Sequence, residues 1–368
     1  MPIHREANSV TTTKIDIIVS TDARYLVGAI VSLAGIALNA KQDTELVFHV
    51  FIPPTGWDKP VNGVTLEFLH TTLRRLHAKS RIVQHVCDET LLSGLPSYAQ
   101  SRMSAVRCFY ATLLPSVDWA LYVDCDILYL ASPEAHFALA DDSAYVCASL
   151  DGNPDAPHID AQWAKDEIGI NLQTNTYFCA GVMLMNLKKF REDGIPNRLS
   201  EFFLRHPRTA HADQTALNVL FNGRNTTIIP QKYDVFHFLL DDRALMDRPV
   251  VHYVVGAPWL PRLSIVANGS FFLWHAFADK YVWRRKGGIH RLVPWRCLVV
   301  KRLIFLLLKT PILHEIFIWA LSKMTSGFDC KAWGRMQAQC KVSKRGIKQV
   351  LDALPPARER TASQPANA

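Results

Sequence analysis

The sequence predicts an α/β domain with a single, mostly parallel twisted sheet and helices on both faces, followed by a basic amphipathic helical tail. Between residues 15 and 260, apolar runs with strand spacing alternate with segments that repeat apolar residues at helical spacing. Acidic residues stand at the ends of several of these runs, where sheets of this class bind ligands. Basic residues are concentrated after residue 280.

The expected elements differ in their apolar patterns. Strands are β-branched or continuous apolar runs, and helices repeat apolar residues every three or four positions. Strands are expected at residues 15–20, 45–52, 81–86, 119–130, 145–149, 177–186 and 250–253, and helices at 25–37, 65–78, 102–114, 196–205 and 213–221.

The first strand ends in Thr21-Asp22, directly before a helical pattern that begins at Tyr25. Strand, acidic turn and helix in this order are typical of nucleotide-binding α/β units, but no dinucleotide fingerprint or P-loop occurs here. Asp22 therefore lies at the carboxyl end of a strand, where a ligand would bind. An ordinary helix N-cap explains this residue equally well.

The run from Trp119 to Leu130 contains two acids, Asp124 and Asp126, in otherwise apolar sequence. Since an unpaired carboxylate is costly to bury, the pair indicates a cation or a strand end that opens into a site. The period of a strand puts both carboxylates on one side and Cys125 on the other. Oxygen ligands of this kind suit Mn2+ or Mg2+. A polar turn after a strand is the alternative.

Further polar residues follow the later strands. Residues 152–176, after Asp151, are long and rich in polar residues, which predicts a binding loop. Gly181 lies within an apolar strand and would allow a close approach of backbone or ligand. Asp213 and Gln214 begin a helix, where Asp213 could also be a plain N-cap. A lone histidine such as His252, in a short strand, is more often structural.

The ordered set of these residues, rather than any one of them, resembles the family 8 glycosyltransferases over residues 15–260. These are retaining enzymes with the GT-A fold, whose single sheet is Rossmann-like. The resemblance implies that Asp124, Asp126 and His252 bind Mn2+ (or Mg2+) together with the diphosphate of a UDP-sugar. It implies catalytic roles for Asp151, Asp213 and Gln214. It also implies a donor-binding set of Thr21, Asp22, Tyr25, Arg107 (with Arg102 as the alternative), Asp124, Cys125, Ala180 and Gly256.

The implied activity is transfer of galactose or glucose from a UDP-sugar to a saccharide or lipid-linked hydroxyl, in synthesis of lipopolysaccharide or another envelope polysaccharide. The resemblance favours front-face attack by the acceptor hydroxyl, with retention, over a covalent intermediate, because the sequence shows no carboxylate in a position typical of a nucleophile. Two alternatives stay open, a nucleotide-sugar or carbohydrate binding protein without turnover and a DxD phosphohydrolase. Leu128 disfavours the phosphohydrolase, which prefers Thr or Val at this position.

Three residues depart from the family pattern. Arg24 and Cys179 replace residues that are usually Asn, and Ala257 replaces a Lys. Loss of that Lys removes a cation from the expected diphosphate site, which Arg24 or an arginine of the tail would have to replace. Cys179 removes a hydrogen-bonding side chain near the sugar, so a weakened or inactive enzyme is compatible with the pattern.

The net charge of +8 conceals two opposite regions. From Tyr281 onward there are 17 Lys and Arg against 4 Asp and Glu, a net charge of +13, whereas residues 1–280 have a net charge of −5. Apolar runs in this tail are interrupted by Lys301, Arg302 and Lys309, and they are too short for a membrane span of about 20 residues. Basic and apolar residues on separate helix faces predict binding to an anionic inner-leaflet surface rather than to nucleic acid. A helical pair packed on the domain is the alternative.

These patterns divide the chain into a polar N-terminal arm at 1–14, a GT-A domain at 15–280, a membrane-associating tail at 281–354 and a disordered end at 355–368. The N-terminal arm lacks the apolar segment of a signal peptide. The eight cysteines never form C-x-x-C, which predicts reduced core residues rather than disulfides or a zinc motif. We therefore expect a cytoplasmic protein that is peripheral on the inner face of the plasma membrane.

Overall fold

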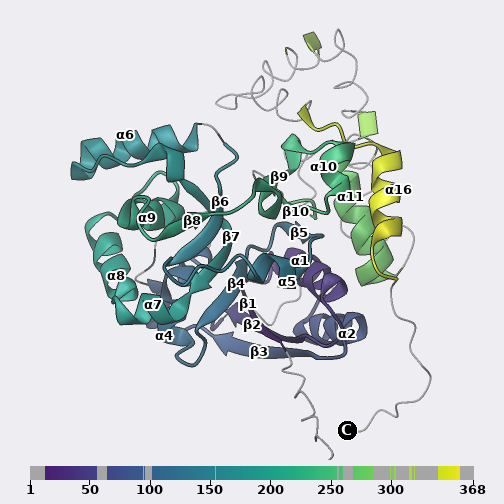
Figure 1. The fold of residues 1–368 in the computed structure, drawn as a ribbon, viewed down its shortest axis with the longest axis horizontal. Coiled ribbons are helices and arrows are strands. Elements are labelled where there is room, and N and C mark those ends of the chain that lie inside the picture. The colour runs from purple at the N-terminus through teal and green to yellow at the C-terminus, as the bar shows by residue number, and fades with distance from the viewer. Residues whose placement is uncertain are drawn as a thin grey trace, which may run out of the picture.

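The computed structural model describes residues 13–55, 64–93, 95, 102–153, 155–254, 257–259, 268–284 and 339–356, with isolated residues between 299 and 319. Ten strands form two sheets beside one another (Figure 1). The strands are β1 Lys14–Ser20, β2 Glu45–Ile52, β3 Ser80–Val86, β4 Trp119–Val123, β5 Ile127–Tyr129, β6 Val146–Leu150, β7 Phe178–Asn186, β8 Thr226–Ile228, β9 Val235–Phe236 and β10 Val250–His252.

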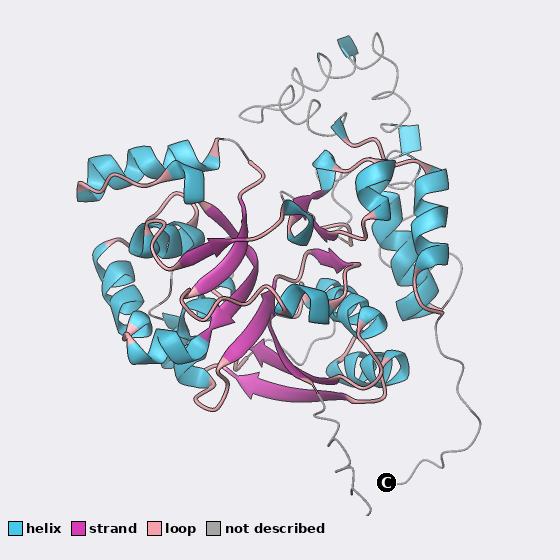
Figure 2. Cartoon of the chain, in the orientation of Figure 1, coloured by secondary structure: helices cyan, strands magenta, loops and turns pink. Residues whose placement is uncertain are grey.

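The larger sheet has the strand order β3-β2-β1-β4-β7-β6-β8. Its strands pair in parallel except at β7, which runs antiparallel to both β4 and β6. The smaller sheet, β5-β10-β9, lies beside the carboxyl end of β4 (Figure 2). The predicted mostly parallel α/β sheet is confirmed, and the antiparallel β7 brings its first residues to the edge where β4 and β6 end.

Helices cover both faces of the larger sheet (Figure 1). The α-helices of the described residues are α1 Leu26–Asn39, α2 Leu66–Leu76, α3 Glu89–Ser93, α4 Tyr110–Leu113, α5 Pro133–Phe137, α6 Ala156–Ile168, α7 Leu187–Glu192, α8 Ile195–Arg205, α9 Ala212–Phe221, α10 Asp242–Met246, α11 Gly269–Phe277 and α16 Lys344–Ala353. Along β4, Leu121 and Val123 pack into the core formed with α1, α2 and α11. Ala120 and Tyr122 point to the other core, formed with α4, α7, α8 and α9. The alternation expected of a strand buried on both faces is therefore present.

Three sequence predictions are wrong in detail. The apolar run 119–130 is not one strand, because β4 and β5 belong to different sheets and residues 124–126 form the turn between them. The polar segment 152–176 is not a simple loop, since it contains α6, whose inner face consists only of Ala156, Asp160 and Ala164. The segment 102–114 contains a 3₁₀ turn at Ser104–Phe109 before the short α4. Small or polar buried side chains hid α6 from the apolar pattern.

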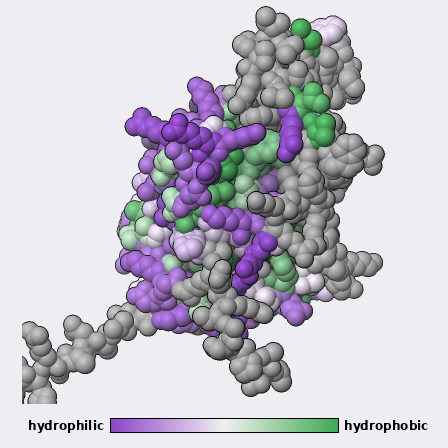
Figure 3. All heavy atoms as spheres, turned by 90° about the vertical axis from the view of Figure 1, so that its right-hand side faces the viewer, coloured by the Kyte–Doolittle hydropathy of each residue, from purple (hydrophilic) through white to green (hydrophobic). Residues whose placement is uncertain are grey.

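The amphipathic pattern at the C-terminal end is confirmed for α16, whose apolar face packs on the domain. Ile347 and Val350 join the core that also contains α11. Lys344, Arg345 and Lys348 are exposed on the opposite face. Much of the described surface on this side of the molecule is hydrophilic (Figure 3). For α16, the alternative prediction of a C-terminal helix packed on the domain is therefore the correct one. The rest of the tail lies largely outside the described residues.

None of the helices within the described residues is long and apolar enough to span a bilayer.

Candidate active site

A cavity of about 930 Å³ opens at the edge of the larger sheet where β1, β4 and β6 end. Parallel strands bring their carboxyl ends to one edge, so side chains from distant parts of the sequence meet there. Of the predicted site residues, Gly256 lies outside the described residues. The other twelve all line the cavity: Thr21, Asp22, Tyr25, Arg107, Asp124, Cys125, Asp126, Asp151, Ala180, Asp213, Gln214 and His252.

Asp124, Asp126 and His252, called here the DxD cluster, each direct one ligand atom to a common region. These atoms lie within 4.8 Å of one another, and His252 Nε2 is 3.5 Å from Asp126 Oδ1. Two carboxylates and one imidazole form a ligand set suited to Mn2+ or Mg2+. Burial raises the pKa of Asp124 to about 6, although the neighbouring Arg107 opposes this rise. Without a cation, the cluster concentrates negative charge in a poorly solvated place.

The two carboxylates converge because of the turn between β4 and β5, not because of strand alternation. The Asp124 backbone N–H donates to the Gly181 carbonyl at 2.8 Å, and the Asp126 carbonyl accepts from the Tyr253 N–H at 2.9 Å. The Cys125 thiol donates to the Ser20 carbonyl at 3.2 Å. Contacts on three sides therefore hold this turn in one shape. Cys125 is buried and belongs to the core that includes α1, and it also lines the cavity.

Gly181 allows His252 to reach the cluster. A Cβ atom at this position would lie 2.2 Å from His252 Cε1, a distance that no side chain can adopt. The predicted close approach at Gly181 is thus confirmed, and the group that approaches is the imidazole.

Asp234 orients His252 and was not identified from the sequence. It is fully buried, and its Oδ1 lies 3.0 Å from His252 Nδ1. A carboxylate on the second ring nitrogen turns Nε2 toward the cluster and makes it a better metal ligand. Burial alone lowers the pKa of His252, but Asp234, Cys179 and Asp126 together raise it well above its usual value. Asp234 follows a 3₁₀ turn with no motif around it, so no sequence signal marked it.

Arg107 is buried between two carboxylates. Its Nη2 donates to Asp124 at 2.8 Å and its Nε lies 2.8 Å from Asp213 Oδ2, while Nη1 donates to the Ala180 carbonyl. Burial alone lowers the pKa of Arg107, but Asp124 and Asp213 raise it above its usual value. Its charge thus connects the DxD cluster to the start of α9. Arg102 is exposed and does not line the cavity.

A hydrogen-bonded group that we call the Gln214 network forms a second part of the cavity lining. Gln214 Nε2 donates to Asp151 at 2.7 Å and to the Tyr177 hydroxyl at 3.1 Å, and its Oε1 accepts from the Ala180 N–H at 2.9 Å. Tyr177 in turn donates to Asp160 at 2.6 Å, and His211 binds the other oxygen of Asp160 at 2.8 Å. Burial raises the pKa of Asp151, against the hydrogen bonds from Asn153 and Gln214. Nearly every polar group here has a partner, so the network holds a fixed shape.

The third wall lies at the end of β1 and contains Asp22, which is not the N-cap of α1, because Tyr25 takes that position. Asp22 Oδ1 accepts from the backbone N–H groups of Arg24 at 2.9 Å and Tyr25 at 3.1 Å, while the residue also lines the cavity. Tyr25 packs edge-on against Trp259, with ring centroids 5.7 Å apart, and mainly burial raises the pKa of Tyr25 to about 12. This wall therefore offers a neutral aromatic ring beside a carboxylate.

The sequence profile of the family described as Glycosyl transferase family 8 matches residues 16–261. The chain belongs to glycosyltransferase family 8. It is 25% identical over 305 residues to a lipopolysaccharide 1,2-glucosyltransferase of Escherichia coli, an alignment that covers 76% of this chain and 79% of the relative. It is 22% identical to glycosyltransferase GlyF of Streptococcus pneumoniae, over 66% of this chain and 56% of GlyF.

Solved glycosyltransferases share the fold. The galactosyltransferase LgtC, in complex with donor and acceptor sugar analogues, superimposes with a TM-score of 0.56 at 22% identity, over 73% of this chain and 96% of LgtC. The bifunctional glycosyltransferase WbbM gives a TM-score of 0.57 at 16% identity, over 80% of this chain and 53% of WbbM. These structures support the GT-A architecture predicted from the sequence.

The departures from the family 8 pattern lie on or beside the cavity. Cys179 is buried next to the DxD cluster, with its Sγ 3.6 Å from His252 Nδ1. The Arg24 guanidinium lies 3.4 Å from Oδ2 of Asp22, which lines the cavity. Ala257 is buried against the core, without a polar side chain. Arg24 is thus the departing residue that places a cation near this wall.

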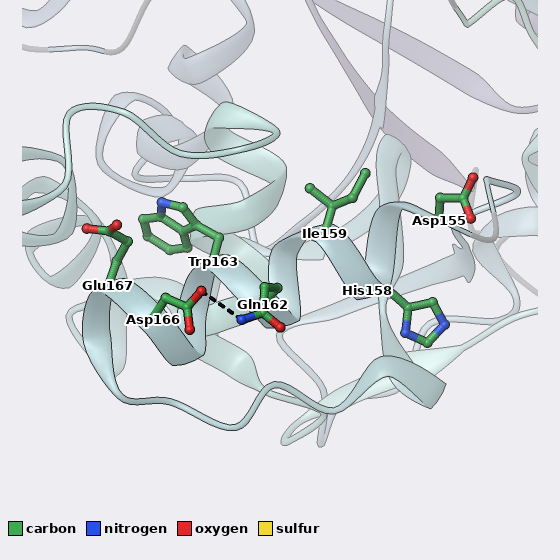
Figure 4. A pocket seen from close by; sticks show the side chains of 7 residues that line it. All are labelled: Asp155, His158, Ile159, Gln162, Trp163, Asp166 and Glu167. Atoms are coloured by element: carbon green, nitrogen blue, oxygen red, sulfur yellow. Dashed lines mark hydrogen bonds between the residues drawn. The ribbon is translucent and has the colours of Figure 1, made fainter.

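A second hollow, of about 700 Å³, lies on the outer face of α6 (Figure 4). Its side chains spread along the helix instead of converging, and Gln162 and Asp166 bond to each other at 2.7 Å. It shares Asp155 with the larger cavity. Without convergent ligands, this hollow lacks the chemistry found in the larger cavity.

Proposed function

We propose that this family 8 glycosyltransferase transfers galactose or glucose from a UDP-sugar to a saccharide or lipid-linked hydroxyl, with retention of configuration. The observation that carries the proposal is that the DxD cluster and the Gln214 network line one cavity. A leaving diphosphate needs positive charge, and the sugar needs a rigid polar surface that holds its reacting carbon. A cation held by the DxD cluster would supply the positive charge, and the Gln214 network would supply the polar surface.

Mn2+, with Mg2+ as the alternative, is the cation proposed for Asp124, Asp126 and His252. The fit rests on the ligand atoms, which are two carboxylate oxygens and an imidazole nitrogen oriented by Asp234. When bound, such an ion neutralises the charge that develops on the leaving diphosphate. The loss of the family lysine at Ala257 places more of this task on the DxD cluster and on Arg24.

Front-face attack by the acceptor hydroxyl is the proposed route to retention. The carboxylate of Asp213 is bound by Arg107, and that of Asp151 by Gln214 and Asn153. Both carboxylates are therefore engaged, which disfavours a covalent glycosyl intermediate. Asp151 and Gln214 instead orient the sugar, while Asp213 acts through Arg107. Thr21, Asp22 and Tyr25 bind the uridine end of the donor.

The proposed setting is the synthesis of lipopolysaccharide or another envelope polysaccharide, at the inner face of the plasma membrane. The Escherichia coli relative supports this setting by its name. Apolar side chains in the basic C-terminal segment also support it: Leu303 is 53% exposed and Ile316 57%. Such residues beside lysines and arginines suit an anionic lipid surface.

A release assay tests the activity. The full-length protein is incubated with UDP-galactose or UDP-glucose, with Mn2+ or with a chelator, and UDP and inorganic phosphate are measured separately. We expect metal-dependent UDP release, and an α-linked product when a saccharide acceptor is supplied. Donor binding without UDP release would identify the binding protein instead, and phosphate release would identify the phosphohydrolase.

Vesicle sedimentation tests the membrane association. Truncation before residue 290 would also remove α16, which is part of the core, so point substitutions are the cleaner probe. Leu303→Asp together with Ile316→Asp should release the protein from vesicles that contain anionic lipid. Unchanged sedimentation of this double variant would defeat the anchoring proposal, and Leu204→Asp, at an exposed leucine of α8, is the control.

A further inference from the structure

We propose that Cys179, His252 and Asp234 form a second metal site, behind the DxD cluster, that binds Zn2+ or a similarly thiophilic cation. The three residues come from the beginning of β7, the end of β10 and the turn before β9. One ligand atom from each lies within 4.8 Å of the others. This inference does not depend on the proposed transfer reaction.

The distances fit a tetrahedral ion. Zinc bonds of about 2.3 Å to sulfur and about 2.0–2.1 Å to nitrogen separate the two ligand atoms by about 3.5 Å. Cys179 Sγ and His252 Nδ1 are 3.6 Å apart. Asp234 Oδ1 is 3.0 Å from the same nitrogen. Three protein ligands leave a fourth position for water, as in zinc sites that remain open.

An unsatisfied oxygen is a second, independent sign of a ligand. Asp234 is fully buried, and its Oδ2 has no hydrogen-bond partner. Buried carboxylate oxygens are almost always paired, because their desolvation is costly. His252 Nδ1 can donate only one N–H, although both Asp234 and Cys179 lie beside it. When this N–H is donated to Asp234, the Cys179 sulfur keeps only a weak contact. A cation bound by the Cys179 sulfur, His252 Nδ1 and both carboxylate oxygens of Asp234 would satisfy all three groups.

The ligand types separate this site from the DxD cluster. A thiolate and an imidazole select zinc-like ions, whereas the two carboxylates of the DxD cluster suit Mn2+ or Mg2+. Cys179 supplies the soft ligand of this site, and the DxD cluster has none. The absence of C-x-x-C does not exclude such a site, because its ligands come from separate strands.

The site is accessible and coupled to the DxD cluster. Cys179 and His252 line the cavity, which gives an ion a route to Asp234. Binding releases the thiol proton to solvent, leaves His252 with its proton on Nε2 instead of Nδ1, and replaces the bond between Asp234 and His252 by bonds to the ion. Because one imidazole offers Nδ1 to this site and Nε2 to the DxD cluster, occupancy of the inner site weakens the outer one.

Cobalt absorption tests the site without any sugar donor. The full-length protein is titrated with Co2+, and the thiolate-to-cobalt charge-transfer band in the near ultraviolet is recorded. We expect one equivalent to develop the band and Zn2+ to abolish it by displacement. Cys179→Asn should lose the band, while Cys87→Ser, a buried cysteine outside the cavity lining, should keep it.

A second variant keeps the thiolate and alters the site from another side. Asp234→Asn should retain the band but weaken cobalt binding at least about tenfold, as expected for loss of one ligand or orienting group. Asp126→Ala, in the DxD cluster, should leave the band in place. A wild-type protein without the band, or a band that persists in Cys179→Asn, would overturn the proposal. Since no donor is present, failure of the transfer reaction would not affect this result.

Discussion

The DxD cluster and the Gln214 network are two walls of one cavity with opposite electrostatic designs. In the DxD cluster, carboxylates converge and burial raises the pKa of Asp124, so the arrangement could hold a cation. In the Gln214 network, each carboxylate is matched by a donor from Gln214, Tyr177 or His211. One wall is therefore built to bind a charge, and the other to hold a shape.

Arg107 joins the two walls and explains how they can differ. Its guanidinium contacts Asp124 on one side and Asp213 on the other. A buried arginine with two partners stabilises both and fixes their separation. Substitutions in the DxD cluster should therefore change the affinity for metal, whereas substitutions in the Gln214 network should change geometry and stability.

The largest effect is expected for Asp126→Asn, which removes one ligand of the proposed cation. Metal-dependent UDP release should fall at least about a hundredfold, because a metal contributes several kcal/mol to the stabilisation of a leaving group. Asp126 is a better target than Asp124, whose loss would also remove one partner of the buried Arg107. Asp166→Asn, in the hollow on α6, is the matched control and should turn over normally. Equal UDP release by Asp126→Asn and Asp166→Asn would contradict the assignment of metal binding to the DxD cluster.

Asp234→Asn should weaken Mn2+ binding by about ten- to a hundredfold, the usual cost of losing a partner that orients a ligand. The effect on turnover should be partly reversed by raising the Mn2+ concentration, because the ligands of the DxD cluster remain. Calorimetric titration of Mn2+ and the metal dependence of UDP release give the two measurements. A loss of activity that no metal concentration restores would place Asp234 in folding rather than in orientation.

The affinity for Mn2+ should depend steeply on pH. Both Asp124 and His252 have raised pKa values, so in the metal-free protein their contributions to stability are present at low pH. The contribution of Asp124 is lost as pH rises through about 6, and that of His252 is lost at higher pH. Since Mn2+ must displace their protons, its affinity should rise by about two decades per pH unit below 6 and about one decade above it.

Thermal unfolding on either side of pH 6 measures this dependence. The increase in melting temperature caused by Mn2+ should grow with pH and disappear in acid. Tyr177→Phe, which alters only the Gln214 network, should show the same pH profile as the wild type. A stabilisation by Mn2+ that is independent of pH would mean that the ion binds elsewhere.

The smallest effect on catalysis is expected for Tyr177→Phe. The hydroxyl donates to Asp160 and accepts from Gln214, so its loss leaves a buried carboxylate with one partner fewer. The free energy of unfolding should fall by about 1–3 kcal/mol. UDP release should decline only a few-fold, since Gln214 keeps its bonds to Asp151 and Ala180. Denaturant titration and UDP release are the measurements, and a change in the affinity for Mn2+ would contradict the separation of the two walls.

Much of the candidate site could be predicted because the carboxyl ends of strands meet at one edge of a parallel sheet. Asp22, Asp124 and Asp151 each follow a strand in the sequence and line one cavity in the structure. Asp234 could not be predicted, since its role depends on a contact with His252 across separate strands. The helix α6 was hidden because its buried face is two alanines and an aspartate.

The sequence by itself determined the mostly parallel α/β class, the positions of most of the longer strands and helices, and the acidic residues at the strand ends. Apolar periodicity and the cost of burying charge are local properties, so they can be read along the chain. Tertiary structure alone decided that Asp124 and Asp126 converge through a turn between two sheets, that Arg107 lies between two carboxylates and that α16 packs on the core. These features depend on which distant groups satisfy each buried charge or apolar face, and periodicity within a single segment does not contain that information.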